Sequence, residues 1–101
     1  MALVYLDDIR LNAEVSGPVG GPGVLLLHAL GTNLTIWDEV LPLLPASLRV
    51  LRYDQRGHGA SDAPAAPYAM GALIRDAERM LTHFGMKETV VVGLSLGGLV
   101  A

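Results

Sequence analysis

The chain has 101 residues, of which 51% are hydrophobic and 17% charged, with a net charge of -3 and no cysteine. It is therefore one domain at most, and its apolar content is typical of a sheet buried on both faces. Without a basic cluster, nothing favours nucleic acid or an anionic membrane as partner, and the lack of cysteine excludes disulfides and a thiolate nucleophile. No apolar run could cross a bilayer and no basic leader is present, so we expect a cytoplasmic protein.

The first third of the chain alternates between strand and turn patterns. Residues 2–6 are apolar, and apolar residues alternate with polar ones over 9–15, which predicts an antiparallel hairpin at a sheet edge. Glycine and proline fill 16–23, and a continuous apolar strand is predicted over 24–28. Residues 29–33 then form a loop at the carboxyl end of this strand, where open α/β sheets place their sites.

A helix is predicted next, capped by Asn33 or Thr32. Pro42 and Pro45 would make this helix short or kinked. Its apolar stripe consists of Ile36, Trp37, Val40, Leu41 and Leu44.

The rest of the chain predicts a crossover between parallel strands. A strand over 48–53 leads into a loop over 54–69 that is long enough to suggest a function. From Met70 to Phe84 apolar residues recur at helical spacing, and Gly85 is a suitable helix stop. The helix connects to a strand over 89–92, so this unit indicates a parallel sheet.

The most informative stretch runs from Thr89 to Ala101. A β-branched strand leads directly into Gly93-Leu94-Ser95-Leu96-Gly97, and an apolar segment compatible with a helix follows. In such a turn the serine adopts strained backbone angles, and the small residues on either side let strand and helix approach. Ser95 would lie at a helix N-terminus, where N–H groups stabilise negative charge on a substrate oxygen. The stretch predicts a nucleophile elbow.

Three motifs in order resemble those of the α/β-hydrolase family. Leu25-Leu26-Leu27-His28-Ala29-Leu30-Gly31 is similar to its strand and oxyanion loop. Tyr53-Asp54-Gln55-Arg56-Gly57-His58-Gly59-Ala60-Ser61-Asp62 is similar to the loop after its next strand, and Gly93-Leu94-Ser95-Leu96-Gly97-Gly98 is similar to its elbow. The resemblance implies an α/β fold with a mostly parallel sheet and a leading antiparallel hairpin. It also implies a serine hydrolase that cleaves an ester or lactone through an acyl-serine.

Within the family, the motifs look most like those of 3-oxoadipate enol-lactonases. Carboxylesterases, C–C bond hydrolases and perhydrolases share the elbow and stay open as alternatives, whereas dehalogenases carry aspartate in the place of Ser95. The resemblance implies that the N–H groups of Leu30 and Leu96 hold the oxyanion. Ala29 stands where the commoner pattern has glycine.

The resemblance implies supporting roles for further residues around the serine. In the oxyanion loop and the elbow these are His28, Gly31, Gly93 and Gly97. Trp37 either lines a substrate pocket or belongs to the core. Asp54, at a strand end, is expected to hold a loop through its carboxylate. Convergent histidines and carboxylates at metal-ligand spacing are absent from the sequence, so we expect no metal and no cofactor.

A serine nucleophile needs a base and an orienting carboxylate. In the family both follow the serine, but the six residues after Ser95 contain no Asp, Glu or His. The resemblance implies structural hydrogen bonds for His28 and His58, and His83 falls on the polar face of a helix. We therefore expect residues 1–101 to be the N-terminal part of a single α/β-hydrolase domain, ending just after the elbow and inactive alone. Its partners would be the C-terminal remainder or a second copy; a non-catalytic fragment or interaction module is the alternative.

Overall fold

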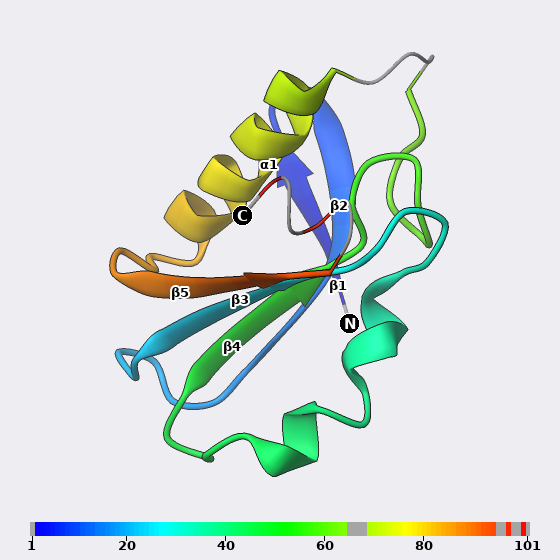
Figure 1. Cartoon of the computed structure of the whole chain (residues 1–101). Coiled ribbons are helices and arrows are strands. Elements are labelled where there is room, and N and C mark those ends of the chain that lie inside the picture. Colours follow the sequence, from blue (N-terminus) through cyan, green and yellow to red (C-terminus); the bar gives the residue numbers. More distant parts are fainter. Residues whose placement is uncertain (1, 65–68, 95–96, 98–99, 101) are drawn as a thin grey trace.

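The computed structural model describes residues 2–64, 69–94, 97 and 100. Five described strands form one sheet in the order β1-β2-β4-β3-β5 (Figure 1). The strands are β1 (Ala2–Leu6), β2 (Ile9–Ser16), β3 (Gly23–Leu27), β4 (Arg49–Tyr53) and β5 (Thr89–Gly93). β2 runs antiparallel to both β1 and β4, whereas β4, β3 and β5 are mutually parallel. The expected α/β fold with a leading hairpin is confirmed.

Side chains along each strand point alternately to the two faces of the sheet, and apolar side chains pack on both faces. On one face, Leu25, Leu27 and Leu51 belong to the same core cluster as Met80 of helix α1 (Met70–His83). On the other face, Leu26 and Val50 pack with Trp37 in a second cluster. Figure 1 shows α1 on one side of the sheet and the segment after β3 on the other.

Helix α1 has the bounds that its apolar spacing predicts. The chain leaves the helix through Gly85, whose φ of +66° is a left-handed conformation that glycine adopts without strain. Met86 N–H then donates to the carbonyl of Leu81 at 2.9 Å. This Gly85 stop turns the chain back toward β5.

The segment after β3 differs from the predicted helix. It contains two short 3-10 helices, η1 (Leu34–Trp37) and η2 (Leu41–Leu43). Asn33 caps η1 as expected, because its side chain accepts a hydrogen bond from Thr35 N–H at 2.9 Å. Pro42 within η2 lacks an N–H, and its ring would clash with the carbonyl four residues earlier, which prevents an α-helix from continuing across it.

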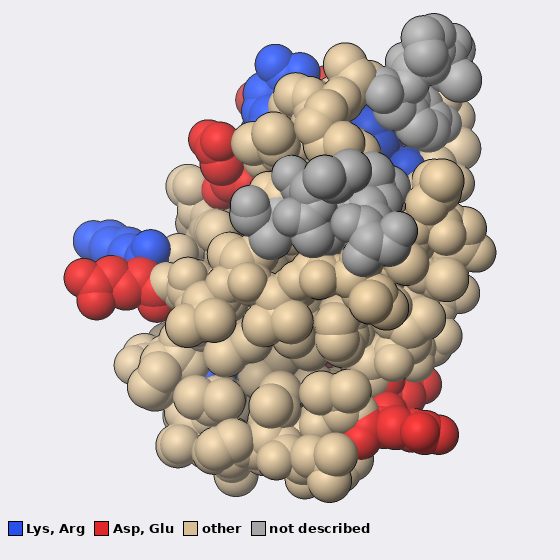
Figure 2. Space-filling view, in the orientation of Figure 1, with Lys and Arg blue, Asp and Glu red and all other residues tan. Residues whose placement is uncertain are grey.

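β5 is the last strand in the order of the described sheet. Its Val90 and Val92 side chains are 65% and 40% exposed. Figure 2 shows that the charged side chains of the described residues lie mostly near the margins of this view. No described helix is long and apolar enough to cross a membrane.

Candidate active site

The candidate site is built from loops at the carboxyl ends of neighbouring strands. β3 pairs in parallel with β4 on one side and with β5 on the other. Parallel strands end at the same edge of the sheet, so the loop over 28–33 after β3 lies between the loop over 54–62 and the segment after β5. The sheet order therefore brings all three family-like motifs together.

His28 is fully buried and fixes the start of the loop over 54–62. Its Nε2 accepts a hydrogen bond from Gln55 N–H at 2.9 Å, and its Nδ1 lies 2.8 Å from the carbonyl of Ala29. Because Gln55 N–H can only donate, these contacts assign a neutral ring that carries its proton on Nδ1. Burial lowers the pKa of His28, and the neighbouring His58 adds to this effect. The ring is thus kept neutral.

His58 makes the reciprocal contact. Its Nε2 accepts a hydrogen bond from Gly31 N–H at 3.0 Å, and its Nδ1 lies 3.1 Å from the carbonyl of Arg56. Gly31 has a φ of +78°, a backbone conformation that suits glycine. His58 therefore holds the oxyanion loop at its left-handed residue.

The loop that carries His58 is anchored on helix α1. The guanidinium of Arg56 donates two hydrogen bonds to the carboxylate of Asp76, at 2.7 and 2.9 Å. Asp76 is 1% exposed and also accepts from Arg79 at 2.8 Å. Paired, bidentate geometry is what allows a carboxylate to stay charged when buried. Sequence inspection missed this ion pair because its partners are 20 residues apart.

Asp54 holds three segments together, in line with the role expected from its place at a strand end. Its carboxylate accepts hydrogen bonds from Leu34 N–H, Ala60 N–H and the Asn12 side chain, at 2.8, 2.9 and 3.1 Å. A Cβ at Gly59 would lie 2.2 Å from this carboxylate, so only glycine fits there. Asp54 thereby joins the hairpin, the oxyanion loop region and its own loop.

The strand that leads to the predicted nucleophile meets β3 closely. Gly93 is the register partner of Leu27, and Leu94 N–H donates to the carbonyl of Leu27 at 3.2 Å. A Cβ at Gly97 would lie 2.3 Å from the same carbonyl oxygen. Glycine at position 97 thus permits the contact between elbow and strand. Ser95 and Leu96, named above as nucleophile and oxyanion donor, lie outside the described residues.

Leu30 projects from the oxyanion loop and is 70% exposed. Its N–H forms no hydrogen bond with the described part of the chain, whereas the N–H groups of Gly31 and Thr32 donate to His58 and Ala29. The loop therefore leaves a backbone donor available at Leu30. Oxyanion holes are built from backbone donors of this kind.

Trp37 lies in the core cluster with Leu26 and Val50 and is 9% exposed. Its indole N–H is buried and finds no acceptor among the described residues. On the same side of the molecule, Arg52 is 5% exposed and pairs with Glu14 and Asp38. The polar–apolar pattern of the strand over 48–53 gives no sign that Arg52 is buried.

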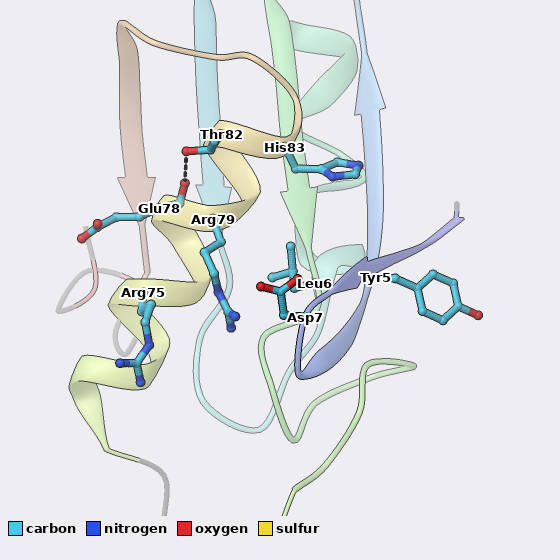
Figure 3. Close-up of a pocket in the computed structure, with 8 residues that line it drawn as sticks. All are labelled: Tyr5, Leu6, Asp7, Arg75, Glu78, Arg79, Thr82 and His83. Carbon is cyan, nitrogen blue, oxygen red and sulfur yellow. Dashed lines mark hydrogen bonds between the residues drawn. The ribbon is translucent and has the colours of Figure 1, made fainter.

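A surface cavity of about 420 Å³ lies away from these loops, between the β1–β2 turn and α1 (Figure 3). Arg75 and Arg79 approach it from the helix and Asp7 from the turn, while Tyr5 points outward. None of its lining residues belongs to the three motifs. It is a second, separate feature of the molecule.

Comparison with known proteins identifies the family of this chain. The sequence model of the alpha/beta hydrolase fold family matches residues 22–101. The chain belongs to the α/β-hydrolase family. Its similarity to 3-oxoadipate enol-lactonase 2 of Acinetobacter baylyi is 35% identity over 93 residues, which cover 92% of this chain and 35% of that protein.

Solved structures and other relatives show the same relationship. The enol-lactonase from Burkholderia xenovorans LB400 superimposes with a TM-score of 0.92 and 33% identity, covering 98% of this chain and 39% of that one. A fluoroacetate dehalogenase from a Burkholderia species is 35% identical over 101 residues, covering 95% of this chain and 33% of that protein. The chain therefore spans between 33% and 39% of the length of these proteins, which are named as enol-lactonases and a dehalogenase.

Proposed function

We propose that this chain supplies the nucleophile and oxyanion loop of a serine hydrolase that cleaves esters or lactones, with enol-lactones as the favoured substrates. The observation that carries the proposal is the approach of Leu94 and Gly97, which flank Ser95 in the sequence, to the carbonyl of Leu27 at the end of β3. Leu27 lies three positions before Leu30, whose N–H forms no hydrogen bond with the described residues. In the Gly-Leu-Ser-Leu-Gly sequence, Ser95 would be the nucleophile.

The reaction would begin with attack of the Ser95 Oγ on the acyl carbonyl carbon, while a base takes the hydroxyl proton. Leu30 N–H and Leu96 N–H would donate to the oxygen of the tetrahedral intermediate. Collapse would break the acyl–oxygen bond and return the proton to the leaving oxygen. In a lactone this oxygen stays tethered to the acyl group, and water then releases the opened acid from Ser95.

The base and its carboxylate would come from residues other than 1–101. His28 and His58 use Nε2 as an acceptor for backbone N–H groups and Nδ1 against backbone carbonyls. His83 lies at the end of α1, on the surface. Among the described residues, backbone groups thus occupy both ring nitrogens of His28 and His58, and His83 belongs to none of the three motifs. We propose that a longer polypeptide completes the triad and pairs with the exposed β5.

Labelling of Ser95 tests the proposal. The full-length protein, meaning the product of the complete gene that encodes this chain, should react with a fluorophosphonate at Ser95 and hydrolyse enol-lactones faster than p-nitrophenyl acetate. Ser95→Ala should abolish both reactions, while Ser47→Ala, at an exposed position, should change neither. Full turnover in Ser95→Ala would remove this serine from the mechanism. A protein that neither labels nor turns over would be the non-catalytic alternative.

A second arm compares the full-length protein with the 101-residue chain. We expect no turnover from the isolated chain, because it provides no general base for Ser95. Serine-dependent hydrolysis by the isolated chain would show that His28 or His58 serves as the base. Preference for p-nitrophenyl acetate over enol-lactones would favour a carboxylesterase.

A further inference from the structure

We infer that His58 is a positioning residue for the oxyanion loop: it fixes the peptide that follows Leu30 and so limits how the Leu30 N–H can turn. The inference rests on the function proposed above and adds a residue that lies 37 positions before the nucleophile. It starts from the hydrogen bond between Gly31 N–H and His58 Nε2, at 3.0 Å. This contact sets the plane of the Leu30–Gly31 peptide, which follows Leu30. The Leu30 N–H belongs to the preceding Ala29–Leu30 peptide, whose carbonyl accepts from Thr32 N–H at 3.2 Å and from Thr32 Oγ1 at 2.6 Å. Thr32 therefore fixes the peptide before Leu30, and His58 fixes the peptide after it.

The acceptor has to be a neutral imidazole with a defined tautomer. A protonated ring would turn Nε2 into a second donor facing Gly31 N–H, and the contact would be lost. The carbonyl of Arg56, 3.1 Å from Nδ1, selects the tautomer with its proton on Nδ1. His58 thus presents its lone pair toward the oxyanion loop.

The Arg56 carbonyl is itself held in place. The Arg56 side chain is clamped to buried Asp76 on helix α1 by two hydrogen bonds, so the loop cannot shift without separating a buried ion pair. The His58 ring also contacts the ring of His28, with centroids 4.9 Å apart. A continuous set of contacts therefore runs from the helix through Asp76, Arg56 and His58 to Gly31.

Rigidity at this point matters for catalysis more than for substrate binding. An oxyanion donor acts on charge that develops in the transition state, so misaiming it lowers kcat with little effect on KM. Gly31 has a φ of +78°, and a Cβ added to it would meet no atom within 4 Å, so packing gives this residue little support. The hydrogen bond from His58 supplies the constraint that packing does not.

The test compares His58→Phe with His58→Gln in the full-length protein. Phenylalanine keeps a planar ring without a hydrogen-bond acceptor, whereas glutamine keeps an acceptor. We expect His58→Phe to speed hydrogen exchange of the Gly31 amide and to lower kcat by about 10- to 1000-fold, up to the loss of one oxyanion donor, with KM within about threefold. In His58→Gln, the exchange rate of the Gly31 amide and kcat should both return most of the way to their values in the unmodified protein. His83→Gln, on the exposed end of α1, should change neither the exchange rate nor kcat.

The outcomes separate this inference from the proposed function. Gly31 exchange that is unchanged in His58→Phe, or accelerated exchange with unchanged kcat, would overturn the positioning role. If Ser95→Ala keeps full turnover, the proposed function fails, while the Gly31 exchange still reports on the hydrogen bond itself. If His58→Phe does not fold, the imidazole ¹⁵N spectrum of the unmodified protein decides. A proton on Nε2 of His58 would overturn the inference, and a proton on Nδ1 would support it.

Discussion

His28 and His58 each accept a backbone N–H from the loop that carries the other. His28 Nε2 binds Gln55 N–H at 2.9 Å, His58 Nε2 binds Gly31 N–H at 3.0 Å, and the two rings are tilted by 54°. Both bonds join residues 27 positions apart. This reciprocal pair locks two loops of the candidate active site to each other without using a histidine for proton transfer.

The buried imidazole of His28 should make stability fall in mild acid. Burial lowers the pKa of His28 below its usual 6.5. Below pH 6.5 the unfolded chain therefore binds a proton at His28 more readily than the folded chain does. The free energy of unfolding keeps its full value above this pH and decreases as the pH falls toward the lower pKa of the folded state. Urea unfolding of the full-length protein at pH 7.5 and 5.5 should show this loss. The decrease in unfolding free energy between pH 7.5 and 5.5 should be smaller in His28→Gln and unchanged in His83→Gln. An equal decrease in the unmodified protein and both variants would rule out His28 as its source.

The oxyanion loop should tolerate one small substitution and resist another. Ala29→Gly moves toward the commoner family pattern and should leave kcat within about threefold of its original value. Gly31→Val places a β-branched residue at a φ of +78°, a conformation that costs about 1–2 kcal/mol for an L-residue. We expect kcat for ester hydrolysis by the full-length protein to drop by about 10²-fold or more. A Gly31→Val variant with full kcat would place the acyl site elsewhere.

Two glycines should respond to alanine in opposite directions. At Gly97 the new methyl group would lie 2.3 Å from the backbone oxygen of Leu27, which cannot move without disturbing β3. We expect Gly97→Ala to reduce the free energy of unfolding by about 1–3 kcal/mol. At Gly71, in the first turn of α1, an added methyl group would meet no atom within 4 Å, and Gly71→Ala should stabilise by up to about 1 kcal/mol. Denaturant titration of both variants measures the contrast, which equal effects would contradict.

The exposed β5 should make the isolated 101-residue chain associate. Val90 and Val92 are exposed on a strand at the end of the described sheet, and no charged residue or proline lies between Thr89 and Gly93. We expect sedimentation velocity to show oligomers or aggregates that Val90→Lys reduces. Val19→Lys is the matched control, because Val19 is 88% exposed but lies in a loop. A monomeric unmodified chain would argue against this edge as a pairing surface.

Local sequence patterns were sufficient to predict most of the elements. Apolar residues at helical spacing from Met70, with Gly85 as a stop, match α1 (Met70–His83) because a periodic stripe and a glycine cap act within a few residues. Alternation over 9–15 likewise matches β2. The segment after Asn33 is the exception: it forms η1 and η2 in place of the predicted helix, and Pro42 prevents an α-helix from continuing across η2. Helical spacing of apolar residues alone therefore does not predict where an α-helix has to end.

The sequence by itself thus determined the fold class, most of the elements and the order of the three motifs along the chain. Only the tertiary structure decided that β3 lies between β4 and β5, and hence which loops meet. The distant partners of His28, His58 and Asp76, which are Gln55, Gly31 and Arg56, depend on the tertiary structure, because these three contacts join residues 20 or more positions apart. A side chain's type shows what it can donate or accept. Which group faces it is set by strand order and register, which no local pattern encodes.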